Sequence, residues 1–422
     1  MKRFSNSAKW VRTTVFSLIS TVSTSMLFAG GVRIVNCDEP VQSVKRGICE
    51  NHLSAEDFKA LAPGVSWFYN WHYETKELPP QGVKMEFIPM CWGDSQDRLD
   101  GLDRYLSNHK PRVVLAINEA NLKGQAFIPP EQAAALYLKI RAIADKHGIP
   151  VVGPNMALGS ANNDSISADD PIENKKVTYT FMVPFLKAFM HYVGDDSKVG
   201  ALAWHGYGAS GEFNWAMNLL TKEFNKPAWV TEYAWWKAPN DAEELKFMMQ
   251  STDAMERSDN VPGYAWFKER VGGNKKISLF EKESGKLTPL GKAYVNMPVH
   301  EKDLYYRVPG KLSAGKYVAM KDMQIFPSSA TDGFIDMAAD KNDASIDYNL
   351  QFESTGPYTV KLRVSGADEV TVTKDGLALG RKAGKDWKTI ETKLQLNKGT
   401  ATLRLTCSEK GQRIESIEFV KP

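Results

Sequence analysis

The fold is indicated by VVLAINE (Val113–Glu119), a short apolar run that ends in an amide and a carboxylate. Similar apolar runs recur along the first two thirds of the chain, and stretches with apolar residues at helical spacing, such as Pro130–His147 and Asp241–Glu256, lie between them. The eight runs are Lys45–Cys49, Val65–Trp71, Val83–Trp92, Val113–Asn118, Ile149–Pro154, Val199–His205, Ala228–Tyr233 and Val261–Phe267. A short buried strand followed by a helix, repeated over about 250 residues, predicts a (β/α)8 TIM barrel.

A doubly wound parallel sheet is the alternative fold for this region. Such a sheet would carry a Gly-rich phosphate-binding loop after its first strand, and Lys45–Ser54 contains none. We therefore assign residues 45–298 to the barrel and leave residues 30–44 as an N-terminal segment.

The last 120 or so residues have a different pattern. After Pro298, short alternating runs such as Tyr358–Val364 are separated by turn residues such as Asp375-Gly376, with no long helical stretch between them. This pattern predicts a C-terminal antiparallel β-sandwich over residues 299–422.

The charge balance argues against nucleic acid as a partner. The 422 residues include 53 Lys+Arg and 50 Asp+Glu, a net charge of +3. Four of the cations and no acid lie in residues 1–29, where an apolar run and small residues follow, as in a secretory signal peptide. Without those residues 49 cations face 50 acids, so we expect an exported chain of net charge −1, secreted or periplasmic, with no membrane span after signal removal. An uncleaved N-terminal anchor is the alternative.

The four cysteines match no metal-ligand spacing. Cys37 and Cys49 are near enough in sequence to close a small loop in an oxidising compartment. We expect neither a metal nor a cofactor.

Candidate catalytic residues stand at the predicted ends of strands, where the active face of a barrel lies. One strand ends in Asn118-Glu119, another in His205-Gly206-Tyr207, and a third in Glu232-Tyr233. Nine of the 11 tryptophans lie between Trp67 and Trp266. Two carboxylates amid aromatic rings suit glycoside hydrolysis, because one carboxyl protonates the leaving oxygen and the rings match the C–H faces of sugars.

Four ordered motifs resemble glycoside hydrolase family 128, a family of β-1,3-glucanases with a (β/α)8 catalytic domain. They are Ser66–Trp71, Glu86–Gly93, Asn118-Glu119 with Gly124-Gln125, and Trp229–Glu232. The resemblance implies that Glu119 is the acid/base and Glu232 the nucleophile of a retaining mechanism, with the carboxyls about 5–5.5 Å apart. Ala120 departs from the family's usual Pro after Asn-Glu, and Cys91 replaces a more usual apolar residue.

Each candidate also has a structural interpretation. Either glutamate could be a solvated loop acid, and Asn118 could cap a helix instead of binding a sugar hydroxyl. His205 and Tyr207 either orient Glu232 or the sugar, or are structural. Four tryptophans are either substrate platforms or core residues, and we expect at least two of them to line the cleft: Trp67, Trp71, Trp204 and Trp266.

Residues 306–421 are similar to family 6-like carbohydrate-binding modules, in which a loop tryptophan stacks on sugar. Trp387 occupies the matching place, although a packing role is the alternative, and Gly411-Gln412-Arg413 departs from the usual ligand-binding Asn. We predict a monomeric, secreted, retaining endo-β-1,3-glucanase acting on polysaccharide. The alternatives are another β-glucanase of the same clan, a non-hydrolytic glucan-binding protein, or a structural protein of the cell wall.

Overall fold

The structure is a computed structural model, and it describes residues 31–272, 275–331, 333–380, 384 and 386–422. The predicted signal peptide, residues 1–29, lies outside these residues. None of the helices in the described range combines the length and the apolar character that a bilayer span requires.

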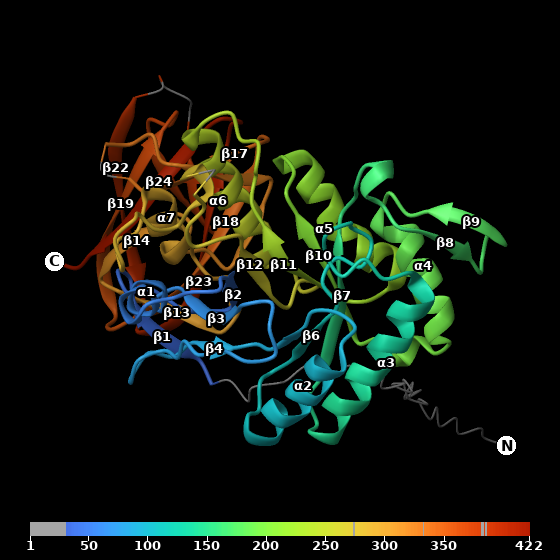
Figure 1. Ribbon diagram of the computed structural model, residues 1–422. Helices are drawn as coiled ribbons and strands as arrows, with labels where there is room; N and C mark the ends of the chain where they lie inside the picture. Colours follow the sequence, from blue (N-terminus) through green and yellow to red (C-terminus); the bar gives the residue numbers. More distant parts are fainter. Residues whose placement is uncertain (1–30, 273–274, 332, 381–383, 385) are drawn as a thin grey trace, which may run out of the picture.

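A nine-stranded parallel sheet forms the centre of the first unit (Figure 1). Its strands, in sheet order, are β4 (Glu86–Phe87), β3 (Val65–Tyr69), β2 (Ser43–Cys49), β12 (Tyr264–Trp266), β11 (Ala228–Tyr233), β10 (Ala201–Gly206), β7 (Val151–Ala157), β6 (Val114–Ala116) and β5 (Met90–Cys91). The two end strands, β4 and β5, are separated in the chain only by Ile88 and Pro89. The sheet thus curls until its ends fall in one chain segment, which fits a TIM-like barrel, and each of the eight predicted runs overlaps at least one of its strands.

Helices follow most of the barrel strands and pack on the outside of the sheet. They are α1 (Ala55–Leu61), α2 (Gln96–Asn108), α3 (Pro130–Lys146), α4 (Met182–Val193), α5 (Ser210–Phe224), α6 (Asp241–Arg257) and α7 (Pro289–Asn296). Local sequence sets their ends: the Ser54 and Asn240 side chains cap α1 and α6, and Gly194 ends α4 in the left-handed conformation. Short 3-10 turns occupy Asn162–Asp164, Asp196–Lys198 and Lys275–Ile277.

The strand–helix repeat is broken once. Residues 70–85, between β3 and β4, contain no helix, where the sequence pattern predicts one after every strand. Pro79 and Pro80 disfavour helical backbone, and Gly82 has a φ of +86°, so this connection is a loop.

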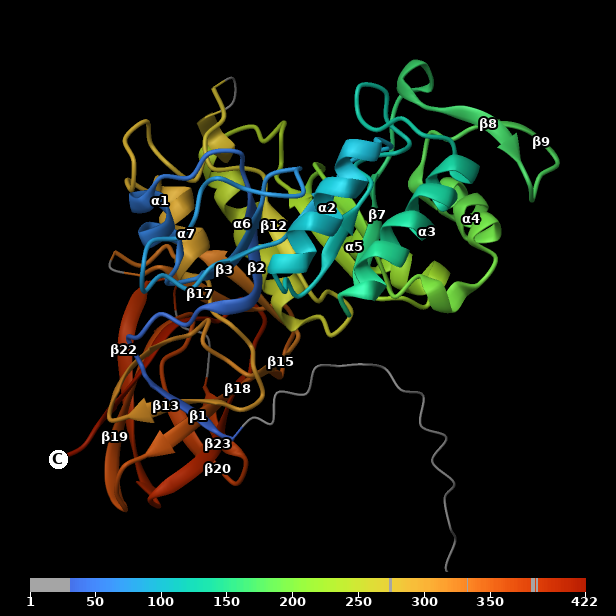
Figure 2. The same cartoon turned by 60° about the horizontal axis from the view of Figure 1, so that its bottom comes forward.

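Two further sheets form the C-terminal region (Figure 2). The first contains β1 (Arg33–Asn36), β13 (Leu304–Val308), β18 (Ala344–Phe352), β23 (Gly399–Cys407), β21 (Gly376–Leu379) and β20 (Val370–Thr373), with β15 (Ala319–Lys321) paired to β18. The second contains β16 (Met323–Pro327), β17 (Ile335–Ala339), β24 (Arg413–Val420), β19 (Gly356–Ser365) and β22 (Trp387–Leu396), with β14 (Gly310–Ser313) paired to β24.

Antiparallel pairing dominates these sheets, as predicted, but three neighbouring pairs are parallel: β1 with β13, β13 with β18, and β21 with β23. The ring of Phe352 on the first sheet contacts Tyr358 and Phe419 on the second. The N-terminal strand β1 lies at the edge of the first sheet, so the segment left unassigned by the sequence packs with the C-terminal region (Figure 2).

One smaller expectation, on the cysteines, is corrected. All four cysteines are free and buried, so Cys37 and Cys49 do not pair; Cys37 Sγ instead donates to the Arg307 carbonyl. The acidic stretch Asp164–Glu173 contributes β8 (Ser167–Asp170) to a hairpin with β9 (Lys175–Thr178) that projects from the barrel (Figure 1). Asp170 is buried there and accepts a hydrogen bond from Tyr179.

Candidate active site

Three barrel strands bring two glutamates and a histidine together at their carboxyl ends. Glu119 follows β6, His205 lies near the end of β10, and Glu232 near the end of β11. Glu119 has a left-handed backbone with a φ of +46°, and its amide donates to the Asn155 carbonyl on β7. Positive φ is uncommon for a residue with a side chain, and such conformations cluster at functional sites.

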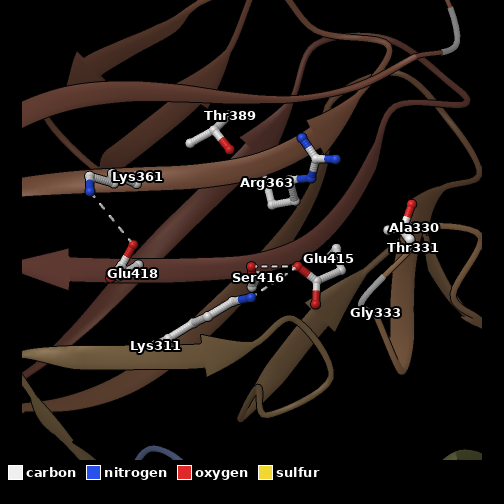
Figure 3. A pocket seen from close by; sticks show the side chains of 10 residues that line it. All are labelled: Lys311, Ala330, Thr331, Gly333, Lys361, Arg363, Thr389, Glu415, Ser416 and Glu418. Atoms are coloured by element: carbon white, nitrogen blue, oxygen red, sulfur yellow. Dashed lines mark hydrogen bonds and ion pairs between the residues drawn. The ribbon is translucent and has the colours of Figure 1, made fainter.

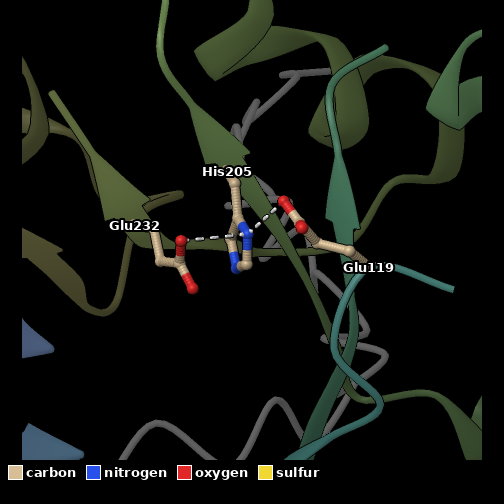
Figure 4. A group of neighbouring side chains, drawn as sticks. All are labelled: Glu119, His205 and Glu232. Carbon is tan, nitrogen blue, oxygen red and sulfur yellow. Dashed lines mark hydrogen bonds and ion pairs between the residues drawn. The ribbon is translucent and has the colours of Figure 1, made fainter. Parts of the chain in front are cut away.

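The imidazole of His205 lies between the two carboxylates (Figure 4). Its Nδ1 atom is 2.8 Å from Glu119 Oε1 and 3.4 Å from Glu232 Oε2. One carboxylate oxygen of each glutamate and this nitrogen all lie within 4.8 Å of one another. The residues that the sequence singled out as a catalytic pair are therefore neighbours, with the predicted orienting histidine between them.

The two carboxylates differ in their hydrogen-bond partners. Glu232 accepts bonds from Tyr69 Oη at 3.1 Å, from Trp71 Nε1 at 2.7 Å and from Tyr207 Oη. Glu119 accepts from His205 alone among the described side chains. Three neutral donors thus fix the position of the Glu232 carboxylate, whereas Glu119 is held by His205.

The pKa values of the groups around the glutamates depend on burial and on the nearby Glu232 and Glu119 carboxylates. Burial raises the pKa of the Tyr69 and Tyr207 phenols, and the Glu232 carboxylate adds to the effect, so both remain donors. Burial works against a charged His205, but the Glu232 and Glu119 carboxylates outweigh it and raise the pKa of the imidazole.

A cavity of about 1170 Å³ opens above the glutamates. Its polar residues include Asn118, whose Nδ2 donates to Gln125 at 3.1 Å and whose buried Oδ1 has no partner among the described residues. Its aromatic wall consists of Trp71, Trp92, Phe181, Tyr207, Trp215, Trp235, Trp236 and Phe267. Trp215 and Trp236 remain 55% and 43% exposed, so large flat surfaces are available to a ligand.

Only one of the four proposed platform tryptophans, Trp71, lines this cavity; the expectation that at least two do is wrong. Trp67, Trp204 and Trp266 are fully buried. The Trp67 ring lies inside the barrel against Trp229, in the space that Gly47 leaves. Trp204 packs on Phe213 of α5, and Trp266 on Phe247 of α6.

Strand alternation explains part of this difference. Successive side chains of a strand point to opposite faces, so Trp204 faces the helices because His205 faces the barrel axis. The same reasoning applied to the sequence would have separated Trp204 from His205 and Tyr207. The tryptophans that the sequence missed, such as Trp92, Trp215 and Trp236, lie on strand-following loops or on α5, where no short-range pattern marks them.

Trp387 lies on β22, far in sequence from the cavity, and is half-buried. Its Nε1 donates to Ser329 Oγ at 3.2 Å. A separate pocket of about 150 Å³ lies on the same sheet, between Lys311, Lys361, Arg363 and Glu415 (Figure 3). That pocket has no aromatic lining residue, and its acids face lysines: Glu418 lies 3.9 Å from Lys361 and Glu415 3.7 Å from Lys311.

Glu119, His205 and Glu232 also form the one group, within the range that the structure describes, whose ligand atoms are close enough to hold a metal ion. The oxygens of Glu232 already accept bonds from three neutral donors, Tyr69, Trp71 and Tyr207. This environment is that of a hydrogen-bonded carboxylate rather than of an open metal ligand.

Comparisons with known proteins agree with this chemistry. Residues 47–294 match the glycosyl hydrolase catalytic core family. A GH128 subgroup II endo-β-1,3-glucanase from Pseudomonas viridiflava is similar in structure, with 29% identity and a TM-score of 0.53 over 61% of this chain and 100% of that one. Another, from Sorangium cellulosum, has 26% identity and a TM-score of 0.51 over 61% and 100%. No curated protein sequence matches the chain. The chain belongs to the glycosyl hydrolase catalytic core family and is a glycoside hydrolase.

Proposed function

We propose that this glycoside hydrolase is an exported, retaining endo-β-1,3-glucanase. The proposal rests on one observation above all: two carboxylates from different strand ends have oxygens within 4.8 Å of each other, beneath an aromatic cavity. Retaining glycosidases place their carboxyls about 5–5.5 Å apart, whereas inverting enzymes need about 6.5–9.5 Å to admit a water. The similar Pseudomonas and Sorangium structures, both described as endo-β-1,3-glucanases, favour the same linkage.

In the first step Glu232 attacks the anomeric carbon while Glu119 donates its proton to the leaving glycosidic oxygen. The C–O bond breaks, a glycosyl ester forms on Glu232, and the first product leaves. In the second step Glu119 takes a proton from water, whose oxygen attacks the same carbon and releases Glu232. Tyr69, Trp71 and Tyr207 hold Glu232 in place throughout.

The C-terminal region is proposed to be a β-sandwich that assists binding to glucan through Trp387. Its two sheets contact each other through Phe352, and Trp387 is its one tryptophan. Export is proposed from residues 1–29; mass spectrometry of the protein recovered outside the cytoplasm is expected to give an N-terminus near residue 30.

The test compares the wild-type protein with Glu119→Gln and Glu232→Gln on laminarin, curdlan, lichenan and a β-1,4-glucan. We expect hydrolysis of the β-1,3 substrates by the wild type and loss of activity in both variants, while Glu131→Gln, an exposed change on α3, remains active. NMR of the first-formed product is expected to show the β-anomer. Inactivity of the wild type on every β-1,3 substrate contradicts the function, and an α-anomer contradicts the retaining mechanism.

A further inference from the structure

Lys268 is one of two lysines, with Lys237, in a cavity otherwise suited to neutral sugar. It follows β12 and lines the cavity. Its Nζ lies 5.8 Å from the centre of the Trp71 ring and 3.1 Å from Glu50 Oε1. An ammonium at this distance from an indole face is attracted to the ring, so Lys268 joins Glu50 to Trp71.

Trp71 is held in an unusual conformation. Its backbone φ is +60°, which is rare for a bulky side chain and is kept only where surrounding contacts require it. The indole packs edge-on against Tyr69 and Phe267, and its Nε1 points to Glu232. The hydrogen bond to the nucleophile therefore depends on groups that fix the ring from outside.

Behind Lys268 lies a buried group of acids. Glu50 and Glu269 are 4% and 5% exposed, and burial, together with the nearby Glu50 carboxylate, raises the pKa of Glu269. Glu50 Oε1 accepts from Lys268 and from the amides of Asn51 and His52, while its buried Oε2 has no other partner among the described residues. The buried Glu50 carboxylate beside Glu269 thus favours the protonated form of Glu269.

The surrounding charges favour that proton. Arg270 contacts Glu269 and binds Asp57 through both of its terminal nitrogens, at 3.2 and 3.0 Å. The group contains Glu50, Glu269 and Asp57 against Lys268 and Arg270, so with every group ionised it carries one excess negative charge. The nearby Cys49 thiol stays neutral because burial raises its pKa. One proton on Glu269 brings the group to neutrality, which a buried site favours.

We propose that Lys268 is a positioning residue that holds Trp71 against Glu232, and that a protonated Glu269 behind Glu50 keeps Lys268 in that position. The inference rests on the proposed glucanase function only for its kinetic test. It adds to that function a lysine that acts on Glu232 through Trp71, and it ties the geometry of Glu232 to a titratable carboxyl, Glu269.

The pair sets a pH limit for this arrangement. Burial and the neighbouring Glu50 raise the pKa of Glu269 to about 8. Above that pH the proton leaves, and a second negative charge competes with the Trp71 ring for the Lys268 ammonium. Activity is then expected to fall on the alkaline side, near pH 8.

The kinetic test measures kcat on laminarin from pH 5 to 10. In Glu269→Gln, which cannot lose a proton, the alkaline fall near pH 8 is expected to disappear. Lys268→Met is expected to lower kcat about 10- to 100-fold with a smaller change in KM, and Lys268→Arg to restore part of the loss, because Arg keeps the cation over the ring. Glu283→Gln and Lys286→Met, at side chains 76% and 61% exposed on the following loop, are the matched controls.

A second measurement needs no substrate. The Trp71 contribution to fluorescence, taken as wild type minus Trp71→Phe, is expected to change near pH 8 in the wild type and to stay constant in the Glu269→Gln background. Thermal unfolding at pH 7 checks that each variant is folded. An unchanged alkaline fall in Glu269→Gln, a wild-type kcat in Lys268→Met, or a Trp71 signal that ignores pH overturns the proposal. Inactivity of the wild type contradicts the glucanase function alone and leaves the fluorescence test decisive.

Discussion

His205 Nδ1 lies 2.8 Å from Glu119 Oε1, and this contact joins the ends of β10 and β6. The same nitrogen is 3.4 Å from Glu232, so one imidazole is close to both candidate catalytic carboxylates. An imidazole in this position orients Glu119 and, when it is protonated, reduces the repulsion between the Glu119 and Glu232 carboxylates.

Removing the imidazole is therefore expected to damage catalysis more than folding. His205→Ala should lower kcat by about 100-fold, since the loss of one preorganised donor has effects of that size. Steady-state kinetics on laminarin measures the change, and His191→Ala, at an exposed histidine of α4, serves as the control. A variant with wild-type kcat would show that His205 is structural.

The charge on His205 is expected to depend on its carboxylate neighbours. Burial lowers the pKa of the imidazole, and Glu232 and Glu119 raise it further than burial lowers it, so Glu232→Gln should lower this pKa. The pKa of His205 is higher in the folded protein than in the unfolded chain, so protonation of His205 stabilises the fold. That contribution is complete below the ordinary histidine pKa and is lost as pH rises through the folded value. NMR titration of the His205 ring protons measures it; equal pKa values in both proteins would contradict the assignment.

Buried and cavity-lining tryptophans are expected to respond differently to truncation. Trp204→Ala should destabilise the protein by about 3–5 kcal/mol, because it empties a large core volume. Trp215→Ala, at a ring 55% exposed in the cavity, should leave stability unchanged and raise KM several-fold. Denaturant unfolding and kinetics on laminarin distinguish the two, and a KM unchanged in Trp215→Ala would remove that ring from the binding surface.

A buried carboxyl outside the catalytic pair gives a prediction about stability. Glu244 is fully buried and accepts a bond from the Trp235 amide at 3.2 Å, and burial raises its pKa to about 8. The folded protein then holds a proton that the unfolded chain releases above about pH 4.5, so stability falls as pH rises from there to about 8.

Glu244→Gln removes this titration and keeps the acceptor for Trp235. The variant should be more stable than the wild type at pH 8, by on the order of 1–3 kcal/mol, with a smaller difference at pH 5. Urea unfolding at both pH values measures it. A difference that does not vary with pH would show that Glu244 is ionised in the folded protein.

The C-terminal tryptophan is expected to act on insoluble substrate only. Trp387→Ala should leave hydrolysis of soluble laminarin unchanged and weaken sedimentation with curdlan several-fold, if the half-buried ring meets glucan. Ile390→Ala, three residues along the same strand, is the matched control. Equal curdlan binding by both proteins would leave Trp387 a packing residue.

Much of the barrel could be predicted from sequence because strand and helix periods are local. Each of the eight runs overlaps a strand, and one cavity is lined by Asn118, Glu119, His205, Tyr207 and Glu232. The missing helix at residues 70–85 was also readable from Pro79 and Pro80. The C-terminal sheets were harder, since β13 to β17 are short and β13 pairs in parallel with β18, a partner about 40 residues away.

By itself the sequence determined the repeated strand–helix pattern, the two glutamates at strand ends and the abundance of tryptophan around them. Only the tertiary structure decided which tryptophans meet the cavity, because strand alternation sets the face of a side chain while its depth depends on neighbours such as Gly47. Tertiary structure alone also gave Glu232 its donors from Tyr69 and Trp71, more than 150 residues earlier. Those contacts form when the sheet curls and brings β3 near β11, and no pattern of period 2 or 3.6 encodes that closure.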